Sequence, residues 1–323
     1  MADDRLEILV ITQDVPTVAD RIGQACPAVR VHAAESAAAL LDRAGQARAV
    51  MGLAQAITPE VVAAMPRLQW IQAFTTGIDP LLSLELPENV MITSARGIHG
   101  PQMSEMAFLH MLALARDLPR IVGNQQQQSW QRWPQRLLLG KTVVVAGIGA
   151  ISEELARRCK AFGMHTVGIS DARSSADSFD EIRPRRDLIA SAAEADFLIV
   201  LTAYTPQTHH LINADVLDAL RPDAFLINLA RGPVVNEAAL VGRLQSRRLG
   251  GAGLDVFDRE PLAADSPLWR LDNVLITPHL GGMSDCYDEQ LLPLVLDNLR
   301  AFAAGQYDQM HNRLSLAEIG VKA

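Results

Sequence analysis

The chain has few cysteines, no long hydrophobic run and no concentration of positive charge. Its 3 cysteines among 323 residues form no Cys-x-x-Cys pair, which argues against a disulfide framework or a cysteine-based metal site. The longest apolar stretch, MAFLHMLALA, contains His110 and is too short to cross a bilayer of about 30 Å. A formal net charge of −8 disfavours binding to nucleic acid through phosphate neutralisation. We therefore expect neither a membrane span nor a nucleic-acid partner.

Metal ligands and a secretory start are missing as well. No group of His, Cys or carboxylate residues has the spacing of a metal site, so we expect no metal. The first residues, MADDRLEILVIT, carry two aspartates where a signal peptide would have basic residues and an apolar core. We expect a cytoplasmic protein.

Two stretches of alternating strand and helix patterns predict an α/β fold with two domains, which suits the length of the chain. Residues 6–95 alternate apolar runs with helix-like segments, and six further apolar runs with helices between them begin at residue 141. This rhythm is typical of Rossmann-like or flavodoxin-like domains with parallel sheets. Between the two stretches, residues 101–118 read as one long helix, followed by the glutamine-rich NQQQQSWQRWPQR.

A glycine pair ends the first strand of the second stretch. VVVAGIGAIS places Gly147 and Gly149 between a strand and a helix, the context that a dinucleotide-binding loop requires. Ser152 stands where a third glycine is usual, and a small residue there still allows close packing of helix on strand. We expect Gly147, Gly149, Ala150 and Ile151 to hold a pyrophosphate at the start of the helix.

The next strand ends in GISDARSS, which bears on the choice between NAD and NADP. An acidic residue about 20 residues after the glycines would bind the ribose hydroxyls and repel a 2′-phosphate. Ser170 lies at the strand end and Asp171 follows it, while Arg173 could instead hold a phosphate. The pattern favours NAD, because an uncompensated carboxylate beside a phosphate is costly, and leaves NADP open.

Polar residues follow the last three strand patterns, where an open α/β sheet places its ligand crevice. Arg231 lies in NLARGPVV, Glu260 in GLDVFDREP and His279 in TPHLGG. A carboxylate at one strand end can orient and charge a histidine that arrives from the neighbouring strand. Asp258, in the same acidic run, reads as a solvated turn residue.

With these three motifs in order, INLARGPVVNEAAL, AGLDVFDREPL and NVLITPHLGG, the chain resembles the D-isomer-specific 2-hydroxyacid dehydrogenases, which include glyoxylate and hydroxypyruvate reductases. The resemblance covers nearly the whole chain. It implies that Arg231 holds the substrate carboxylate and carbonyl, that Glu260 pairs with the imidazole, and that His279 is the acid/base. It also implies that Asp255 lies near the nicotinamide carboxamide.

The implied reaction is hydride transfer between NAD(P)H and a small 2-oxo acid or D-2-hydroxy acid. Glyoxylate and hydroxypyruvate are the first candidates. The loop FTTGID matches the family's substrate-carboxylate loop, which makes Thr76 and Gly77 substrate-binding candidates. Further candidates to line the cofactor are Thr202, Leu229, Ala230, Gly281 and Gly282.

The resemblance also implies a domain plan and a homodimer. Residues 1–98 plus 288–323 would form the substrate (catalytic) domain, and residues 99–287 the NAD(P)-binding Rossmann domain, with a last helix at about 285–304 returning to the first domain. The dimer would form through the cofactor domain, in part through the helix at 101–118. The alternative function is a dinucleotide-sensing, corepressor-like binding module. The role of His99, near the expected hinge, stays open.

Overall fold

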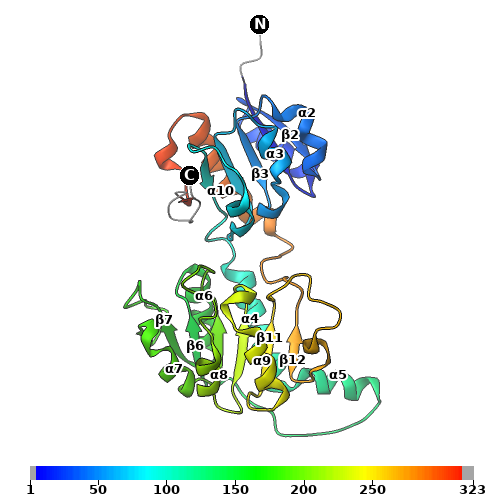
Figure 1. The fold of residues 1–323 in the computed structure, drawn as a ribbon, viewed down its shortest axis with the longest axis vertical. Coiled ribbons are helices and arrows are strands. Elements are labelled where there is room, and N and C mark those ends of the chain that lie inside the picture. Colours follow the sequence, from blue (N-terminus) through cyan, green and yellow to red (C-terminus); the bar gives the residue numbers. More distant parts are fainter. Residues whose placement is uncertain (1–4, 315–323) are drawn as a thin grey trace. The chain divides into compact units, whose positions relative to one another are not determined.

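The computed structural model describes residues 5–314, which form two compact α/β units (Figure 1). Unit 1 contains the described residues up to Ile98 and from Ser284 onward, and unit 2 contains His99–Met283. Unit 2 is therefore inserted into the sequence of unit 1. Each unit has one mainly parallel sheet. This confirms the predicted fold class of two Rossmann-like or flavodoxin-like domains, one inserted into the other.

Within the described residues, unit 1 holds a six-stranded sheet. Its strands and α-helices are β1 (Leu6–Ile11), α1 (Val15–Ala25), β2 (Val29–Ala34), α2 (Leu41–Ala44), β3 (Ala49–Gly52), α3 (Pro59–Ala63), β4 (Trp70–Ala73), β5 (Met91–Thr93), α10 (Tyr287–Ala303) and β13 (Arg313–Leu314). The strand order is β13-β5-β4-β3-β1-β2, and β13 alone of these pairs antiparallel. At two residues, β13 is too short for its sequence to show a strand pattern.

The helix α10 returns the chain to the first unit, as the sequence predicts. Leu291, Val295 and Leu299 of α10 pack in the same core as Ile8 and Val10 of β1. The next residues of β1 along the strand face the other core, because successive side chains of a strand point to opposite faces. Helices therefore cover both faces of this sheet.

All residues of unit 2 are described, and its sheet has seven parallel strands in the order β12-β11-β10-β9-β6-β7-β8. Its strands and α-helices are α4 (Gly100–Arg116), α5 (Leu118–Gln126), β6 (Thr142–Ala146), α6 (Ala150–Ala161), β7 (His165–Ile169), β8 (Glu181–Arg183), α7 (Leu188–Glu194), β9 (Phe197–Val200), α8 (Ala214–Ala219), β10 (Phe225–Asn228), α9 (Glu237–Gln245), β11 (Gly251–Leu254) and β12 (Val274–Ile276). Alternate residues of β6 belong to two hydrophobic cores, one on each face. Because both faces of the sheet are buried, the strands of unit 2 have nearly continuous apolar sequences.

The predicted single helix over 101–118 is divided in the structure. Asp117 adopts a left-handed conformation, φ 55°, which ends α4 and starts α5 with Pro119 in its first turn. Aspartate tolerates this backbone region better than most residues, and proline fits the first turn of a helix. The glutamine run lies at the end of α5 and in the irregular segment after it.

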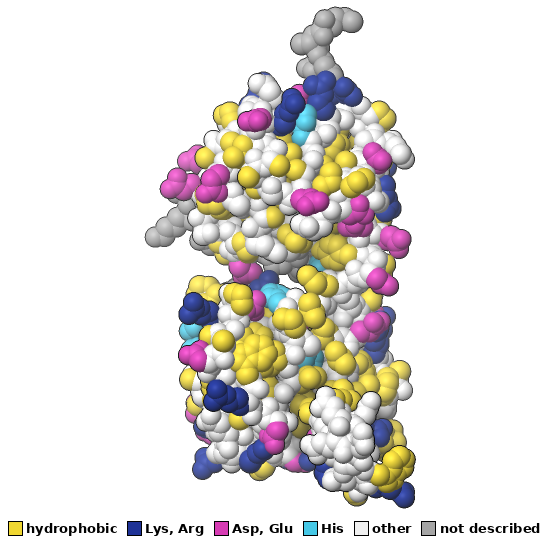
Figure 2. Space-filling view, turned by 90° about the vertical axis from the view of Figure 1, so that its right-hand side faces the viewer, with side chains coloured by type: hydrophobic (Ala, Val, Ile, Leu, Met, Phe, Trp, Pro, Cys, Tyr) yellow, Lys and Arg dark blue, Asp and Glu magenta, His cyan; other side chains and the backbone are white. Residues whose placement is uncertain are grey.

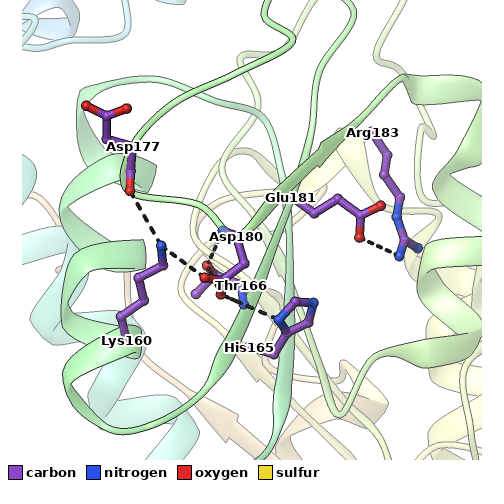
Figure 3. Close-up of polar contacts among 7 residues, drawn as sticks. All are labelled: Lys160, His165, Thr166, Asp177, Asp180, Glu181 and Arg183. Carbon is purple, nitrogen blue, oxygen red and sulfur yellow. Dashed lines mark hydrogen bonds and ion pairs between the residues drawn. The ribbon is translucent and has the colours of Figure 1, made fainter.

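The seventh strand of unit 2, β8, is absent from the six that the sequence predicts. Its three residues are charged or half-buried, and Arg183 pairs with Glu181 at 2.7 Å, so no apolar run marks it (Figure 3). The carboxylate of Asp180, just before β8, accepts hydrogen bonds from the N–H and hydroxyl of Thr166 in β7 at 2.8 and 2.9 Å. Lys160 of α6 lies 3.0 Å from the same carboxyl group. Charged residues are typical of edge strands, and here they fix β8 to the sheet.

None of the helices in residues 5–314 is both long enough and apolar enough to cross a membrane.

Candidate active site

The three residues of the predicted constellation follow adjacent parallel strands of unit 2. Arg231 comes after β10, Glu260 after β11 and His279 after β12, and the sheet order places these strands side by side. Because the strands are parallel, their carboxyl ends lie at one edge of the sheet. The structure therefore brings all three segments to the same edge.

His279 and Glu260 form a direct contact. The Nδ1 atom of His279 lies 2.7 Å from Oε2 of Glu260, and Oε1 of Glu260 accepts a hydrogen bond from the N–H of Phe257 at 3.0 Å. Both carboxylate oxygens are thus engaged, which fixes the carboxylate relative to the strand end. The two side chains keep 47% and 36% of their surface exposed, so a small molecule can reach them.

Arg231 is held in place by its own loop. Its Nη1 atom donates to the carbonyl of Ala230 at 2.7 Å, and its carbonyl accepts from the side chain of Asn228 at 3.0 Å. The next residue, Gly232, packs against the backbone of Phe257, and a Cβ atom added there would overlap the carbonyl group of Phe257. Only glycine permits this approach, which couples the Arg231 loop to the loop that carries Glu260.

Asp255 has a structural role that the sequence motif does not reveal. Its side chain is 1% exposed. Its carboxylate accepts hydrogen bonds from the hydroxyl of Thr277 at 2.6 Å and from the N–H groups of Leu280 and Gly281 at 2.9 Å each. The carbonyl of Asp255 also accepts from the N–H of His279 at 2.9 Å. Asp255 therefore holds the loop on which His279 lies.

The backbone of His279 itself is left-handed, with φ 54°. Histidine adopts this region more readily than bulky or β-branched residues do. Beside it, a Cβ atom on Gly281 would lie 2.8 Å from Oδ2 of Asp255, so a side chain there would push the carboxylate aside. The loop needs its glycine to close over Asp255.

Asp258, expected to be a solvated turn residue, has an exposed side chain but is not an isolated charge. Its N–H donates to Glu237 at 3.1 Å. Partial burial raises the pKa of its carboxyl group, an effect that His210 and His209 oppose. Partial burial likewise raises the pKa of Glu237. The three carboxylates of the acidic run therefore have different roles. Asp255 is buried and anchors a loop, Asp258 is an exposed turn residue, and Glu260 is the partner of His279.

The glycine loop after β6 has the geometry of a phosphate cradle. Gly147 has φ 103°, and a Cβ atom there would lie 2.7 Å from the N and Cα atoms of Thr202, which follows β9. At Gly149, by contrast, a Cβ atom would meet nothing within 4 Å, so the space before α6 is open. The first N–H groups of α6, including those of Ala150 and Ile151, have no partner within the helix. Such a helix start fits a dinucleotide pyrophosphate.

Ser152 does more than replace a glycine. Its hydroxyl lies 2.7 Å from the N–H of Gly149, from which it accepts, and 2.9 Å from the carbonyl of Gly149, to which it donates. It is 1% exposed and closes the first turn of α6. The small polar side chain thus both permits close packing and caps the helix.

At the end of β7, each expected cofactor residue has a partner within unit 2. The Oδ1 atom of Asp171 accepts from the N–H of Arg185 at 2.8 Å, and the Arg185 Nε atom lies 3.5 Å from Oδ2. Arg173 pairs with Glu153 of α6. The hydroxyl of Ser170 accepts from the N–H of Arg173 at 3.2 Å. Arg185 and Glu153 lie too far away in sequence for the local motif to indicate these pairs.

The other cofactor candidates lie at or near the same edge of unit 2. The N–H of Leu229 donates to Val200 at 3.2 Å, and the N–H of Ala230 donates to the side chain of Asn228 at 3.1 Å. A Cβ atom on Gly282 would lie 3.4 Å from the ring of His99, which is the N-cap residue of α4. His99 is therefore packed beneath the loop that carries His279.

The turn that contains Thr76 and Gly77 belongs to unit 1. The hydroxyl of Thr75 donates to the carbonyl of Gly77 at 2.6 Å, and that of Thr76 donates to Ala95 at 3.3 Å. The hydroxyl of Tyr287, from α10, donates to the carbonyl of Phe74. Sequence reasoning missed Tyr287, because 213 residues separate it from the carbonyl that it binds.

Within residues 5–314, no group of three or more His, Cys, Asp or Glu side chains could hold a metal ion.

Comparison with known proteins places the chain in a family. Residues 108–281 match the family model described as D-isomer specific 2-hydroxyacid dehydrogenase, NAD binding domain. The chain is 32% identical over 267 residues to a glyoxylate reductase of Pyrococcus horikoshii, covering 79% of each protein. It is 32% identical over 264 residues to a hydroxyphenylpyruvate reductase of Plectranthus scutellarioides, covering 80% of this chain and 83% of that one.

A solved structure is similar along almost the entire chain. The D-isomer specific 2-hydroxyacid dehydrogenase family protein of Aeromonas salmonicida superposes with a TM-score of 0.89 at 33% identity, covering 96% of this chain and 99% of the other. The predicted nicotinamide dinucleotide cofactor and the predicted oxidoreductase class are thereby confirmed. On the strength of the matched model and these relatives, the chain belongs to the D-isomer specific 2-hydroxyacid dehydrogenase family.

Proposed function

We propose that the protein reduces a small 2-oxo acid to its D-2-hydroxy acid with NAD(P)H, and that glyoxylate and hydroxypyruvate are its first candidate substrates. Unit 2 would be the cofactor domain and unit 1 the substrate domain. The observation that carries the proposal is the 2.7 Å contact between Nδ1 of His279 and Glu260. It joins an imidazole and a carboxylate at the sheet edge where an α/β fold places its ligand.

His279 is proposed as the acid/base, acting through Nε2. Because Nδ1 faces the carboxylate of Glu260, the Nδ1–H group donates a hydrogen bond to that carboxylate. Nε2 is then the nitrogen that faces the substrate. When bound in unit 2, a reduced nicotinamide would supply the hydride that C2 of the oxo acid accepts. The Nε2–H of His279 then gives its proton to the oxygen, and Glu260 stabilises the imidazolium before transfer.

Arg231 is proposed to bind the substrate. Its guanidinium matches the planar geometry of a carboxylate and stabilises negative charge that builds on the carbonyl oxygen. The contact between Gly232 and the Phe257 backbone would keep the guanidinium in register with the His279–Glu260 pair.

The turn of unit 1 is proposed to bind the substrate carboxylate through the N–H groups of Thr76 and Gly77. Hydroxyl groups hold the carbonyls of Phe74, Gly77 and Ala95 around this turn. With those carbonyls fixed, the turn presents a constant set of N–H groups to an anion.

Absorbance at the nicotinamide band, followed with a panel of 2-oxo acids and both reduced cofactors, tests the proposal. The panel should include glyoxylate, hydroxypyruvate and an aromatic oxo acid. His279→Ala should lower kcat by about 10²–10⁴-fold while cofactor binding, measured by fluorescence, is kept. His165→Ala, an exposed histidine on β7, is the matched control and should leave kcat unchanged. Dinucleotide binding without turnover of any oxo acid would instead support a binding module.

We infer a preference for NAD over NADP. Asp171 is paired with Arg185 and Arg173 with Glu153, so each arginine near the expected ribose already has a carboxylate partner. A 2′-phosphate would have to compete with those carboxylates. Asp171→Arg should shift the ratio of kcat/KM values toward NADPH, and an unchanged ratio would contradict the assignment.

A homodimer is proposed to form through unit 2. The segment from α5 to β6 exposes apolar side chains, of which Trp130 is 94% exposed, and Figure 2 shows apolar side chains at the surface of this unit. The other exposed apolar residues of the segment are Leu118, Ile121, Val122, Leu137 and Leu139. Most of α4, expected to lie partly in the interface, is buried inside unit 2. Light scattering of the wild type and of Ile121→Asp would test this, since the variant should shift the mass toward a monomer.

A cytoplasmic location is also proposed. Cys26, Cys159 and Cys286 are all free thiols, which suits a reducing compartment.

A further inference from the structure

A partly buried chain of hydrogen bonds runs from α4 to the loop that carries His279. The Nε2 atom of His110 lies 3.1 Å from Oγ1 of Thr277, and that hydroxyl donates to Oδ1 of Asp255 at 2.6 Å. Asp255 in turn accepts from the N–H groups of Leu280 and Gly281. Side chains from a helix and from two strand ends are thereby joined to one loop.

The direction of every bond in this chain is fixed by its last acceptor. A carboxylate can only accept, so the single hydroxyl proton of Thr277 points at Asp255. Toward His110 the hydroxyl oxygen can then only accept, so Nε2 of His110 must carry the proton and donate. Nε2 of His110 therefore carries a hydrogen. Because Nδ1 has no hydrogen-bond partner in the described part of the chain, the neutral tautomer with a lone pair on Nδ1 is favoured.

The site of the imidazole is fully enclosed. His110 has no exposed surface, and in the described part of the chain Nδ1 has no hydrogen-bond partner. A Cβ atom on Gly253 of β11 would overlap this ring, so the glycine makes the room that His110 occupies. Burying a polar ring with Nδ1 unsatisfied is unfavourable for stability, so we look for a role of Nε2, the nitrogen that bonds Thr277.

We propose that His110 is a positioning residue, which holds Thr277 and Asp255 in the one arrangement that keeps the His279 loop ordered. This inference rests on the proposed function of His279. Without the donor at Nε2, the oxygen of Thr277 loses one of the two contacts that fix its position, so Asp255 is held less firmly. The loop N–H groups then lose their constant acceptor, and His279 loses its alignment with Glu260.

The charges around His110 agree with a neutral ring. Burial lowers the pKa of His110 to about 4, and the nearby carboxylate of Asp255 opposes that shift without overcoming it. The strands packed on α4 at this point contribute Gly253 from β11 and Thr277 after β12. Protonation would place a hydrogen on Nδ1 where no acceptor is available.

Hydrogen exchange of the amides in residues 277–283 tests the positioning role apart from activity. His110→Leu and Thr277→Val should each speed exchange of the Leu280 and Gly281 amides by about tenfold, the effect of one buried hydrogen bond. His110→Gln keeps a donor at a similar reach and should restore slow exchange. Met111→Ala, a buried change on the same helix, is the control: it should lower stability without speeding exchange in this segment.

Steady-state kinetics then connect the loop to turnover. We expect kcat to fall by about tenfold in His110→Leu and Thr277→Val, with the double variant no worse than Thr277→Val alone, because His110 acts through that hydroxyl. Exchange that is unchanged in both single variants, or equally fast in Met111→Ala, would overturn the inference. If His110→Leu does not fold, Thr277→Val and His110→Gln still decide between the outcomes. A wild type without reductase activity would refute the proposed function, while the exchange data would still decide the positioning of the loop.

Discussion

Each unit has a buried polar network in its core, and the two networks differ in charge and in where they end. In unit 1, Trp70 donates to Thr93, Thr93 donates to Gln72, and Asn298 of α10 donates to Gln72. These side chains are all neutral, and Asn298 closes the network on the backbone of His311. In unit 2 the network contains a carboxylate and a titratable imidazole, and it ends on the loop of the candidate acid/base.

The network of unit 1 stabilises the fold, whereas the network of unit 2 also supports the candidate active site. A neutral network between strands and a returning helix gains stability at every pH, since none of its groups titrates in the usual range. A network that contains a buried carboxylate and an imidazole of lowered pKa is sensitive to pH and to the loss of any one member.

The largest effect is expected from Gly232→Ala. The added Cβ atom would overlap the Phe257 carbonyl, so the Arg231 loop and the Glu260 loop must separate. We expect a loss of about 3 kcal/mol in the free energy of unfolding and at least about 100-fold in kcat/KM. Urea unfolding and steady-state kinetics measure the two.

Gly242→Ala in α9 is the matched control, because a Cβ atom there meets nothing within 4 Å. It should stabilise unit 2 by up to about 1 kcal/mol and leave turnover unchanged. Equal behaviour of the two variants would show that the loops do not need their contact.

The second effect is a pH dependence of stability that belongs to unit 2. The pKa of His110 falls from 6.5 to about 4 on folding, so the unfolded chain binds this proton first. The contribution of His110 to the free energy of unfolding is fully present above pH 6.5 and decreases as the pH falls toward 4. Below pH 4 it changes no further, and the total loss is about 3 kcal/mol. Urea unfolding at a series of pH values, compared between wild type and His110→Gln, measures it. A loss of the same size in the variant would mean that other groups cause it.

Asn298→Ala removes a member of the neutral network in unit 1. The substitution leaves the N–H of His311 and one acceptor position of Gln72 without partners, which should cost about 2 kcal/mol. The cost should be the same at pH 5 and pH 7, and kcat should stay within about twofold of wild type. A cost that changed with pH would place a titrating group in the network of unit 1.

The smallest effect is expected from Tyr287→Phe. Burial raises the pKa of Tyr287 to about 12, so its hydroxyl stays a donor to the Phe74 carbonyl at any ordinary pH. Removing it should cost about 1 kcal/mol and raise the KM for the oxo acid by about fivefold with little change in kcat. Tyr307→Phe, on the same unit, is the control. A fall in kcat with unchanged KM would argue against a role of the turn in substrate binding.

Much of the fold and the core of the candidate site could be predicted from the sequence. The periodic apolar runs indicate the long strands because burial on both faces demands them, and the glycine loop and three motifs stand at strand ends. Short or charged strands such as β8 could not be predicted, since ladder pairing and salt bridges replace apolar contacts there. The break at Asp117 was missed because the apolar pattern continues across it.

The family, the cofactor class and the motifs that carry Arg231, Glu260 and His279 can be recognised in the amino-acid sequence, because each depends on a local pattern that follows a strand. The distant contacts that support these segments follow from the folded structure and not from the motifs. Gly232 against Phe257, His110 with Thr277, and Tyr287 with Phe74 join segments that are distant in the chain. The reason is physical: such contacts depend on how backbones pack within a folded unit, and no spacing along the chain encodes that distance.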